Sequence, residues 1–503
     1  MSSTEIAELG FLRLDARRRI PLFRQLYEQI RAAVLEGRLN ANDRIPSSRD
    51  LVTQLGVSRT TVVSAIELLT SEGYLQTRRG RGTFVCGEIP DDLLVPEGSI
   101  KDAETIEQTA PCSLSDFGIS AQAIDPSQWH HGVPVPFCPG EPALDAFPID
   151  VWSKLVRRIW KTVSLKDLSY GEPAGYFPLR VQIAKYLGVH RGVNCDTSQV
   201  IIVNGTQQAI DVVARIALNQ GDSVLFEDPG YVSARNTFEK HGAKVVSMPV
   251  DRDGARVRET TQRYPDARMA YVTPSHQYPM GVTLPIQRRL ELVKWAESNN
   301  AIVLEDDYDS EYRYSGRPLP SLQGLSGKSQ MIYVGSFSKV VFPALGLGYA
   351  IVPKSMVNAF ENTLKLTSRP GSKIDQIVLS EFIREGHFVR HLRKMRSLHS
   401  RRRRVFVEAF QEHLSTKMSL VGNAAGLHCT ALLNEKMGPD KKIAAELAQC
   451  GIIVRALSDY FSEATRDSLE RNGLVFGFAC CTPSRTRKRL KEVSTIASLV
   501  PCY

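Results

Sequence analysis

A lysine stands beside two serines directly after an apolar run, in the string Gly335-Ser336-Phe337-Ser338-Lys339. A lysine amine at the end of a strand can form a Schiff base with an aldehyde cofactor, and a neighbouring hydroxyl can donate to a phosphate. The alternative is a surface lysine in a loop, which one Ser-x-Ser-Lys string does not exclude. The string therefore predicts a cofactor site only if other residues supply the rest of it.

Two carboxylates, Asp306 and Asp307, end the apolar run 302–304. A carboxylate against the ring nitrogen of a pyridine cofactor keeps that nitrogen protonated, which preserves the ring as an electron sink. The alternative is a metal-binding or capping acidic cluster. The sequence leaves Asp306 and Asp307 both open for this role, although Asp306 and Tyr308, two apart on a strand, would share one face.

Two further motifs can hold the remainder of such a cofactor. The string Asn204-Gly205-Thr206-Gln207 joins an apolar run to a helical pattern, so it is expected to form a helix N-terminus. The free N–H groups at a helix N-terminus can bind a phosphate. Tyr231 follows the turn Asp228-Pro229-Gly230, where its ring can stack on a pyridine. An ordinary helix cap and a core tyrosine are the alternatives.

A second group of polar residues lies near the N-terminus, among two short predicted helices. Ser47 or Ser48 caps a helix that runs to about Leu55, Gly56 makes the turn, and Ser58 caps the next helix. This is the helix-turn-helix arrangement, whose second helix suits the major groove of DNA. A small helical packing domain is the alternative. The residues predicted to reach phosphates or base edges, there and in a following β-hairpin wing, are Arg44, Ser47, Ser48, Arg49, Ser58, Arg59, Thr60, Thr61, Arg78, Arg79 and Arg81.

These motifs fall into three regions of the 503-residue chain. Residues 20–87 read as a winged helix-turn-helix, mainly helical with a β wing. Residues 88–145 have the scattered proline, glycine and acidic residues of a linker. In residues 146–503 short apolar runs alternate with amphipathic stretches, which predicts an α/β domain with a mainly parallel sheet.

Composition narrows the class of protein. A net charge of +9 is compatible with a polyanionic partner. Nine cysteines without a CxxC pair indicate reduced thiols in a cytosol, and we expect no metal site. Neither a signal peptide nor a run of roughly 20 apolar residues is present, so we expect a cytoplasmic protein without a membrane partner.

Taken together, the strings resemble those of known families. The segment 20–87, with Arg-Ile-Pro-Ser-Ser-Arg-Asp-Leu at 44–51 and Gly-Val-Ser-Arg-Thr-Thr-Val at 56–62, resembles the GntR-type winged helix. The chain from about 146 resembles the class I/II aminotransferases of fold type I, which bind pyridoxal 5′-phosphate (PLP). The whole chain resembles the MocR/GabR family of regulators, of which the strings beginning at Tyr170, Glu227, Thr273 and Glu305 are typical.

The resemblance implies a role for each residue of the cofactor site. Lys339 forms the Schiff base with PLP, Asp306 pairs with the ring nitrogen, Tyr308 contacts the ring hydroxyl and Tyr231 stacks on the ring. The residues expected around the phosphate are Gly205, Thr206, Gln207 and Ser336. Tyr170 is expected to reach the phosphate of the partner subunit, since these domains are usually dimers with shared sites.

The sequence also departs from the family pattern. Gly346 stands seven residues after Lys339, where the family has a phosphate-binding arginine, so a charge-assisted bond is missing. The segment 474–479 lacks the arginine that holds a substrate carboxylate in aminotransferases, and Arg455 or Arg471 are the alternatives for that role. Tyr278 precedes Pro279 where true aminotransferases have an asparagine.

The sequence therefore predicts a homodimeric transcription regulator that binds a double-stranded DNA operator. Its PLP-binding domain senses a small amine or amino-acid-type effector, which shifts the arrangement of the two DNA-binding heads. Two alternatives stay open: a PLP-dependent aminotransferase with a DNA-binding head, and a regulator whose PLP site has decayed into a dimerisation scaffold. The missing carboxylate arginine argues against efficient transamination, so at most weak transaminase activity is expected.

Overall fold

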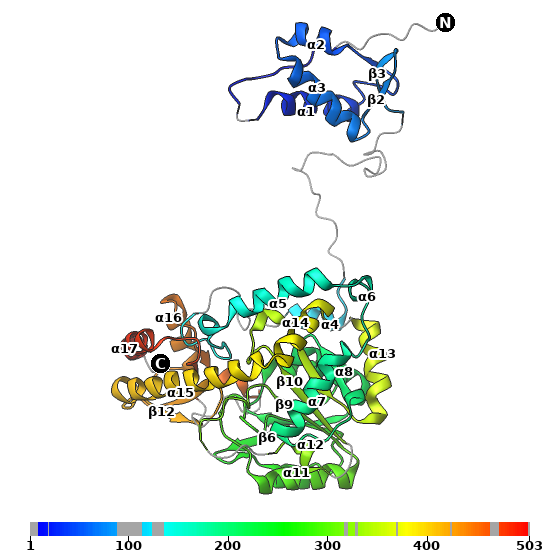
Figure 1. Ribbon diagram of the computed structural model, residues 1–503. Coiled ribbons are helices and arrows are strands. Elements are labelled where there is room, and N and C mark those ends of the chain that lie inside the picture. The colour runs from blue at the N-terminus through cyan, green and yellow to red at the C-terminus, as the bar shows by residue number, and fades with distance from the viewer. Residues whose placement is uncertain are drawn as a thin grey trace. The chain divides into compact units, whose positions relative to one another are not determined.

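The computed structural model describes residues 9–18, 20–87, 113–122, 135–315, 320–326, 330–368, 371–422, 425–462 and 472–500. The chain divides into two compact units, Met1–Leu114 and Ser115–Tyr503 (Figure 1). The linker predicted for 88–145 lies outside the described residues except for 113–122 and 135–145. None of the helices in the described ranges is long and apolar enough to span a bilayer.

The N-terminal unit is a winged helix. Its helices are α1 (Leu22–Leu35), α2 (Ser48–Leu55) and α3 (Arg59–Ser71), and its strands are β1 (Arg44–Ile45), β2 (Leu75–Arg78) and β3 (Gly82–Val85). The strands form an antiparallel sheet in the order β1-β3-β2. Leu26, Ile30, Val62 and Leu69 are fully buried between α1 and α3, because apolar residues recur along one face of each helix. The predicted helix-turn-helix and wing are therefore present.

The larger unit is built on an eight-stranded sheet in the order β4-β11-β10-β9-β8-β5-β6-β7. The neighbouring strands β10 and β9, β9 and β8, β8 and β5, and β5 and β6 are parallel. The strand β11 runs antiparallel to both of its neighbours, β4 and β10, and β7 runs antiparallel to β6. The strands are β4 (Val200–Val203), β5 (Ser223–Asp228), β6 (Lys244–Asp251), β7 (Gly254–Ala255), β8 (Met269–Val272), β9 (Ile302–Asp307), β10 (Met331–Ser336) and β11 (Gly348–Ile351).

A second sheet of four antiparallel strands has the order β12-β13-β15-β14. Its strands are β12 (Met418–Val421), β13 (His428–Leu433), β14 (Arg455–Ala456) and β15 (Gly473–Gly477). Of the short apolar runs that predicted an α/β domain, those at 200–203, 223–226, 270–272, 301–304 and 331–334 are the strands β4, β5, β8, β9 and β10. The sequence reading did not identify β6, β11 or the second sheet.

Helices lie on both sides of the large sheet (Figure 1). The helices of the larger unit, of which α16 packs on the small sheet, are α4 (Asp116–Gln122), α5 (Ile149–Thr162), α6 (Leu165–Leu168), α7 (Phe177–Arg191), α8 (Gly205–Ala217), α9 (Val232–Lys240), α10 (Val257–Arg263), α11 (Ile286–Asn299), α12 (Leu322–Leu325), α13 (Val357–Thr367), α14 (Lys373–Arg384), α15 (His387–Leu414), α16 (Asp440–Gln449) and α17 (Pro483–Leu499). Because both faces of the parallel strands are covered, these strands read as continuous apolar runs.

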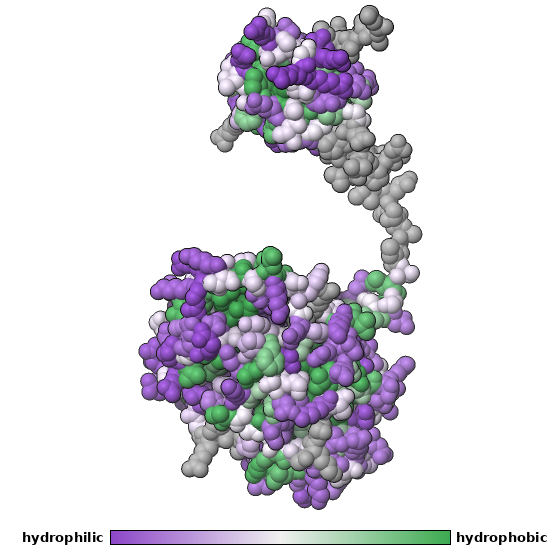
Figure 2. Space-filling model, turned by 45° about the vertical axis from the view of Figure 1, so that its right-hand side comes forward, coloured by the Kyte–Doolittle hydropathy of each residue, from purple (hydrophilic) through white to green (hydrophobic). Residues whose placement is uncertain are grey.

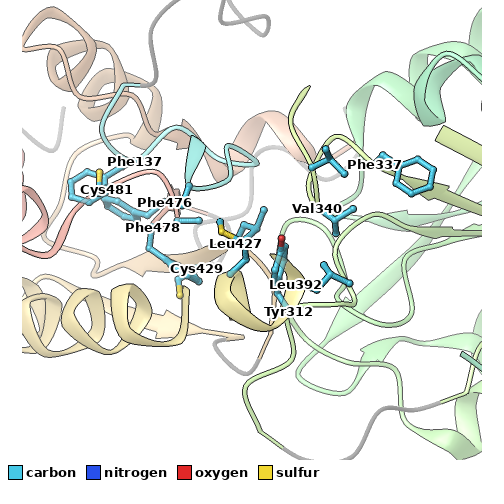
Figure 3. Packing of buried hydrophobic residues seen from close by; sticks show 14 of the residues in the cluster. Phe137, Tyr312, Phe337, Val340, Leu392, Leu427, Cys429, Phe476, Phe478 and Cys481 are labelled. Carbon is cyan, nitrogen blue, oxygen red and sulfur yellow. The ribbon is translucent and has the colours of Figure 1, made fainter. Parts of the chain in front are cut away.

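A core of buried side chains joins the two sheets of the larger unit. Phe137, Phe476 and Phe478 pack with Cys481, and Figure 3 shows Leu427 and Tyr312 between this group and Val340. Val340 follows the strand β10, whereas Leu427 and Phe476 belong to the region of the small sheet. This packing fixes the small sheet beside the carboxyl ends of the parallel strands, where α/β proteins bind ligands.

Candidate functional site

A cavity of about 440 Å³ opens where the parallel strands β5, β8, β9 and β10 end. Eight of the nine residues predicted to bind the cofactor line it: Gly205, Thr206, Gln207, Tyr231, Asp306, Tyr308, Ser336 and Lys339. These residues come from four separate segments, which only the fold brings together. The ninth, Tyr170, does not line the cavity and is 82% exposed in the single chain.

Lys339 lies in the turn after β10, with its amine directed into the cavity. Burial lowers the pKa of its ammonium, while Glu141, Asp309, Cys138 and Asp306 partly oppose that shift. A lowered pKa increases the neutral fraction of the amine, which is the nucleophilic form. Gly140 approaches this amine so closely that a Cβ there would lie 3.0 Å from Nζ.

The geometry separates the two carboxylates that the sequence left open. Ile302 and Leu304 pack on the face of the sheet that carries α8, and Asp306, two residues further on, emerges on the same face and lines the cavity. Tyr271 donates a hydrogen bond to it at 2.7 Å. Asp307 lies on the opposite face, where Arg191 pairs with it at 2.8 Å. Asp306 is thus the carboxylate that a ligand in the cavity can reach.

Asp306 forms no ion pair among the described residues, although the charge of Lys339 opposes the rise of its pKa. Burial raises its pKa to about 7, with Asp307 and Asp309 adding to the rise and the hydrogen bond from Tyr271 opposing it. Its second oxygen, Oδ1, is buried and has no hydrogen-bond partner among the described residues. A buried carboxylate in this state favours a bound cation or proton.

One end of the cavity is built for an anion. The helix α8 begins at Gly205, whose φ of +78° is a backbone conformation that glycine adopts without strain. The first N–H groups of a helix have no acceptor within the helix, so they are available to a phosphate. The hydroxyl groups of Ser233, Ser336 and Ser338 stand among the residues that line the cavity with this helix terminus.

Four tyrosines form an aromatic wall of the cavity. The ring of Tyr278 lies 6.0 Å from that of Tyr231, 5.8 Å from that of Tyr308 and 5.3 Å from that of Tyr460, in edge-on contacts. The hydroxyl groups of Tyr278 and Tyr460 are 2.9 Å apart. Rings in these positions can enclose a planar cofactor and its ligand.

Beside this wall, His276, Asp309 and His428 place ligand atoms within 4.8 Å of one another, and Asp309 and His428 line the cavity. Nδ1 of His276 lies 3.0 Å from Asp309 Oδ2 and 3.1 Å from the hydroxyl group of Tyr308, which also donates to the backbone oxygen of His276 at 2.9 Å. The group is closely packed, since a Cβ at Gly426 would overlap the His276 ring. Its hydrogen bonds fix the ring of Tyr308 at the cavity.

The departures from the family pattern have a structural counterpart. Gly346 does not line the cavity; its φ is +64°, and a Cβ there would meet open space. Val475 and Phe476 are fully buried core residues. Arg455 does line the cavity, whereas Arg471 lies outside the described residues.

Sequence reasoning missed several residues of the cavity. Asp309 and Tyr278 stand inside strings that had been singled out, and their nearness to Tyr308 and Pro279 was an available signal. Gly140 and Glu141 come from a segment near 140 that lacks strand or helix periodicity. His428 begins a strand of the small sheet, and nothing in its local pattern identified it.

In the N-terminal unit the caps lie where the sequence placed them. Ser47, one of the two predicted alternatives, caps α2: its hydroxyl accepts from the N–H of Asp50, whose carboxylate in turn accepts from the N–H of Ser47. The hydroxyl of Ser58 accepts from the N–H of Thr61 at 3.2 Å and thereby caps α3. Ser48 is the first residue of α2.

Arginines surround these caps and form the tip of the wing. Arg49, Arg59 and Thr60 are exposed at the starts of α2 and α3, and Arg79 and Arg81 flank Gly80 between β2 and β3. Arg44 and Arg78 are held against the wing: a Cβ at Gly82 would lie 3.0 Å from Nε of Arg44, and Arg78 donates to Asn42. Elsewhere in the unit, Arg18, Arg24 and Arg38 form ion pairs with Asp15, Glu28 and Glu36.

Comparison with family models gives two matches. Residues 22–85 match the bacterial regulatory proteins of the gntR family, and residues 135–467 match the class I and II aminotransferases. Among solved structures, the kynurenine aminotransferase of Pyrococcus horikoshii is similar to 76% of the chain, with 98% of that chain covered, a TM-score of 0.66 and 23% identity. The larger unit thus has the expected α/β aminotransferase fold.

Two curated proteins are similar over nearly the whole length of the chain. The probable rhizopine catabolism regulatory protein MocR of Rhizobium meliloti is 37% identical over 95% of this chain and 94% of its own. The pyridoxine biosynthesis transcriptional regulator PdxR of Corynebacterium glutamicum is 33% identical over 94% of this chain and 96% of its own.

Proposed function

The chain belongs to the MocR-type transcription regulators, in which a gntR-type head precedes an aminotransferase-like domain, and on this premise we propose that a small amine controls its binding to operator DNA. The winged helix holds the DNA, and the cavity holds PLP together with the amine. One observation carries the proposal: a single cavity collects Lys339, Asp306 and the first turn of α8.

The residues of the cavity fit PLP. The orphaned, buried Oδ1 of Asp306 and the raised pKa of that carboxyl both favour a cationic group, which a protonated pyridine nitrogen supplies. The phosphate fits the N-terminus of α8, with the hydroxyl groups of Ser336 and Ser338 beside it. Because Gly346 carries no side chain, this phosphate is held by N–H and hydroxyl groups without the usual guanidinium group.

When bound, PLP supplies an electrophilic aldehyde and an electron sink. The residues around it have distinct tasks. Lys339 presents an amine that is partly neutral because burial lowers its pKa. Asp306 would hold the ring nitrogen protonated, and Tyr308, whose hydroxyl group is fixed by its hydrogen bonds with His276, would contact the ring hydroxyl. The aromatic wall excludes water from the ligand.

The DNA contact rests on the exposed start of α3 and on the wing. A capped helix N-terminus with Arg59 and Thr60 can enter the major groove, while Arg79 and Arg81 reach phosphates beside it. The protein can adopt more than one arrangement of its two units. An amine that binds one arrangement more tightly than another increases the population of that arrangement, and the affinity for DNA changes with it. A protein that binds operator DNA acts in the cytoplasm, where the chromosome lies.

We further propose that the protein is a homodimer. Large apolar or aromatic side chains are exposed along α5, α6 and the start of α7, with Leu165 86% and Tyr170 82% exposed. Others in this region are Ile149, Trp160, Leu168 and Phe177. Apolar side chains also interrupt the hydrophilic surface of the larger unit in Figure 2. Exposed apolar side chains that recur over successive elements support a protein interface, in which Tyr170 would reach the partner's PLP phosphate.

The test uses the purified full-length protein with PLP and a DNA fragment that it binds. We expect visible absorbance after PLP uptake, a dimer in sedimentation, and a change in DNA affinity with at least one amine of a broad panel. Failure to take up PLP would leave only a dimerisation scaffold. Steady amino-group transfer at rates of roughly 1 to 1000 per second, without an effect on DNA, would identify an enzyme instead.

A further inference from the structure

Two histidine rings lie against each other at the cavity, one from the loop after β8 and one from the start of β13. The ring centroids of His276 and His428 are 4.7 Å apart, and both side chains are buried. Each ring has one nitrogen without a hydrogen-bond partner among the described residues, Nε2 of His276 and Nδ1 of His428. An unpaired polar atom in a protein interior costs free energy unless a ligand satisfies it.

The partners of the other two nitrogens show which form each ring takes. Nδ1 of His276 lies 3.0 Å from Asp309 Oδ2, and Nε2 of His428 lies 3.0 Å from the backbone oxygen of Pro279. An ionised carboxylate and a carbonyl oxygen only accept, so each of these nitrogens carries a proton and donates it. A second proton on either ring would be buried without an acceptor among the described residues. Both rings are therefore neutral, and each has one bare nitrogen lone pair.

Metal-binding histidines have the same arrangement. Such a histidine donates its second N–H to a carboxylate or a backbone carbonyl, which orients the ring and increases the basicity of the nitrogen that binds the metal. Asp309 and the carbonyl of Pro279 supply these two partners. The main chain also holds the ring of His276 in place, since a Cβ at Gly426 would overlap the ring and one at Gly281 would lie 3.2 Å from Nε2.

A carboxylate completes the set of donors. Asp309 is buried, and one ligand atom from each of His276, Asp309 and His428 lies within 4.8 Å of the other two. Because a carboxylate has two oxygens, Asp309 can accept from His276 with one and bind an ion with the other. Ligand atoms of one tetrahedral zinc ion are about 3.3 Å apart, so these atoms need to approach one another by about 1.5 Å at most.

We propose that His276, His428 and Asp309 bind a divalent transition-metal ion such as Zn²⁺. Imidazole nitrogens suit zinc, iron, nickel and copper, whereas Mg²⁺ and Ca²⁺ prefer oxygen ligands. Asp309 and His428 line the cavity, so a water molecule or a donor atom of a ligand can complete the coordination from that side. The three residues come from separate segments, so no metal-binding spacing appears in the sequence. The site goes beyond the proposed function, because neither operator DNA nor an amine requires it.

The experiment uses the purified full-length protein, freed of metal with a chelator, and Zn²⁺ as the probe. Calorimetry and metal analysis after gel filtration should show a tight zinc site in each chain, and an excess of Mg²⁺ should not displace the zinc. The shift in Tm on addition of zinc is a second readout, since an ion that binds only the folded state stabilises that state.

Variants assign the zinc to these side chains. His276→Gln, His428→Gln and Asp309→Asn should each weaken binding at this site by roughly 100-fold or more, because even the loss of an outer partner of a ligand costs 10- to 100-fold. His428→Cys should retain zinc, since a thiolate is also a zinc ligand, and it separates loss of a ligand from loss of folding. His190→Gln, which removes an exposed histidine of α7 outside the cluster, is the matched control and should bind zinc as the wild type does.

Two results would overturn the proposal: the wild-type protein takes up no zinc at micromolar concentrations, or His428→Gln binds zinc as tightly as the wild type does. PLP absorbance and DNA binding are measured on the same samples. Zinc uptake is measured without an amine and without DNA, so its outcome is independent of the proposed function. A wild-type protein that binds PLP and DNA but no zinc would remove the metal site alone.

Discussion

Arg49 and Arg59 in the N-terminal unit are exposed to solvent, whereas Asp306 and Lys339 in the larger unit are surrounded by protein. The exposed arginines stand on capped helices whose stability depends on other atoms. Burial of Asp306 and Lys339 shifts their pKa values, so their chemistry and the stability of the fold depend on the same side chains. A change at the DNA-binding face should therefore alter function alone, while a change in the cavity should alter function and stability together.

The largest effect is expected at Lys339. Lys339→Ala removes the amine that is held in the cavity, so the protein incubated with PLP should show no visible absorbance from a covalently held cofactor. DNA binding without an effector should be retained, because the winged helix is a separate unit. Absorption spectra after gel filtration measure the bound cofactor, and gel shifts measure DNA binding. Persistent visible absorbance in the variant would contradict the assignment of Lys339.

The next effect concerns the DNA-binding face. Arg44→Ala, Arg49→Ala and Arg59→Ala combined should lower DNA affinity by roughly a hundredfold at low salt and flatten its salt dependence, because each lost phosphate contact reduces the slope by about one. Gel shifts at several salt concentrations measure the slope. Arg256, which precedes α10, and Arg258 and Arg263 within it are also exposed and provide a control triple variant of equal charge. If the salt dependence of the triple variant at Arg44, Arg49 and Arg59 were unchanged, the assignment of the DNA-binding face would be wrong.

Asp306→Asn tests the coupling between function and stability. The variant should bind PLP more weakly, by about tenfold or more, since a neutral amide cannot hold the pyridine nitrogen protonated. The pKa of Asp306 is raised to about 7 from 3.8, so the stability that this group contributes is fully present below pH 4 and is lost as the pH rises through 7.

It follows that the PLP-free variant should gain stability relative to the wild type as the pH increases. Its Tm should exceed that of the wild type by a few degrees at pH 8, and by less at pH 6. Thermal unfolding at the two pH values measures this difference. A variant that loses stability at pH 8 would show that the carboxylate is not in the buried, unpaired state.

The smallest effect is expected at a helix cap. Ser47→Ala removes the hydroxyl group that accepts from the N–H of Asp50, although the backbone N–H of residue 47 still donates to the Asp50 carboxylate, and should destabilise the winged helix by about 1 kcal/mol. The cavity should keep its PLP absorbance unchanged. Ser47→Asp, which preserves a capping oxygen, is the control. Calorimetry of the full-length protein should show a shift only in the transition of the N-terminal unit.

The same contrast explains what could be predicted from the sequence. The caps at Ser47 and Ser58 are local, because donor and acceptor lie three residues apart. Lys339, Asp306 and Tyr231 were also predictable, because each follows an apolar run and the carboxyl ends of parallel strands meet at one edge.

Other features depend on packing between distant segments. Asp306 and Asp307 differ only in the face of β9 on which they emerge. The ion pair of Asp307 with Arg191 of α7 shows that Asp307 faces away from the cavity. His428 and Arg455 reach the cavity from the small sheet, whose strands are too short for periodicity to identify; β14 has two residues. The strand pairing that sets Arg455 against Val475 joins positions 20 residues apart and leaves no local signal.

Gly140 has a consequence for how such a cavity can diversify. Its φ of +81° disfavours any other residue, and a Cβ there would lie 3.0 Å from the amine of Lys339. The wall next to that amine is therefore bare main chain, which point mutations can scarcely reshape. New ligand preferences in a descendant of this protein would have to arise on the opposite wall, around Arg455 and Tyr460, where side chains can be exchanged. The lineage can change which molecule it detects while the part of the cavity that receives the amine stays the same.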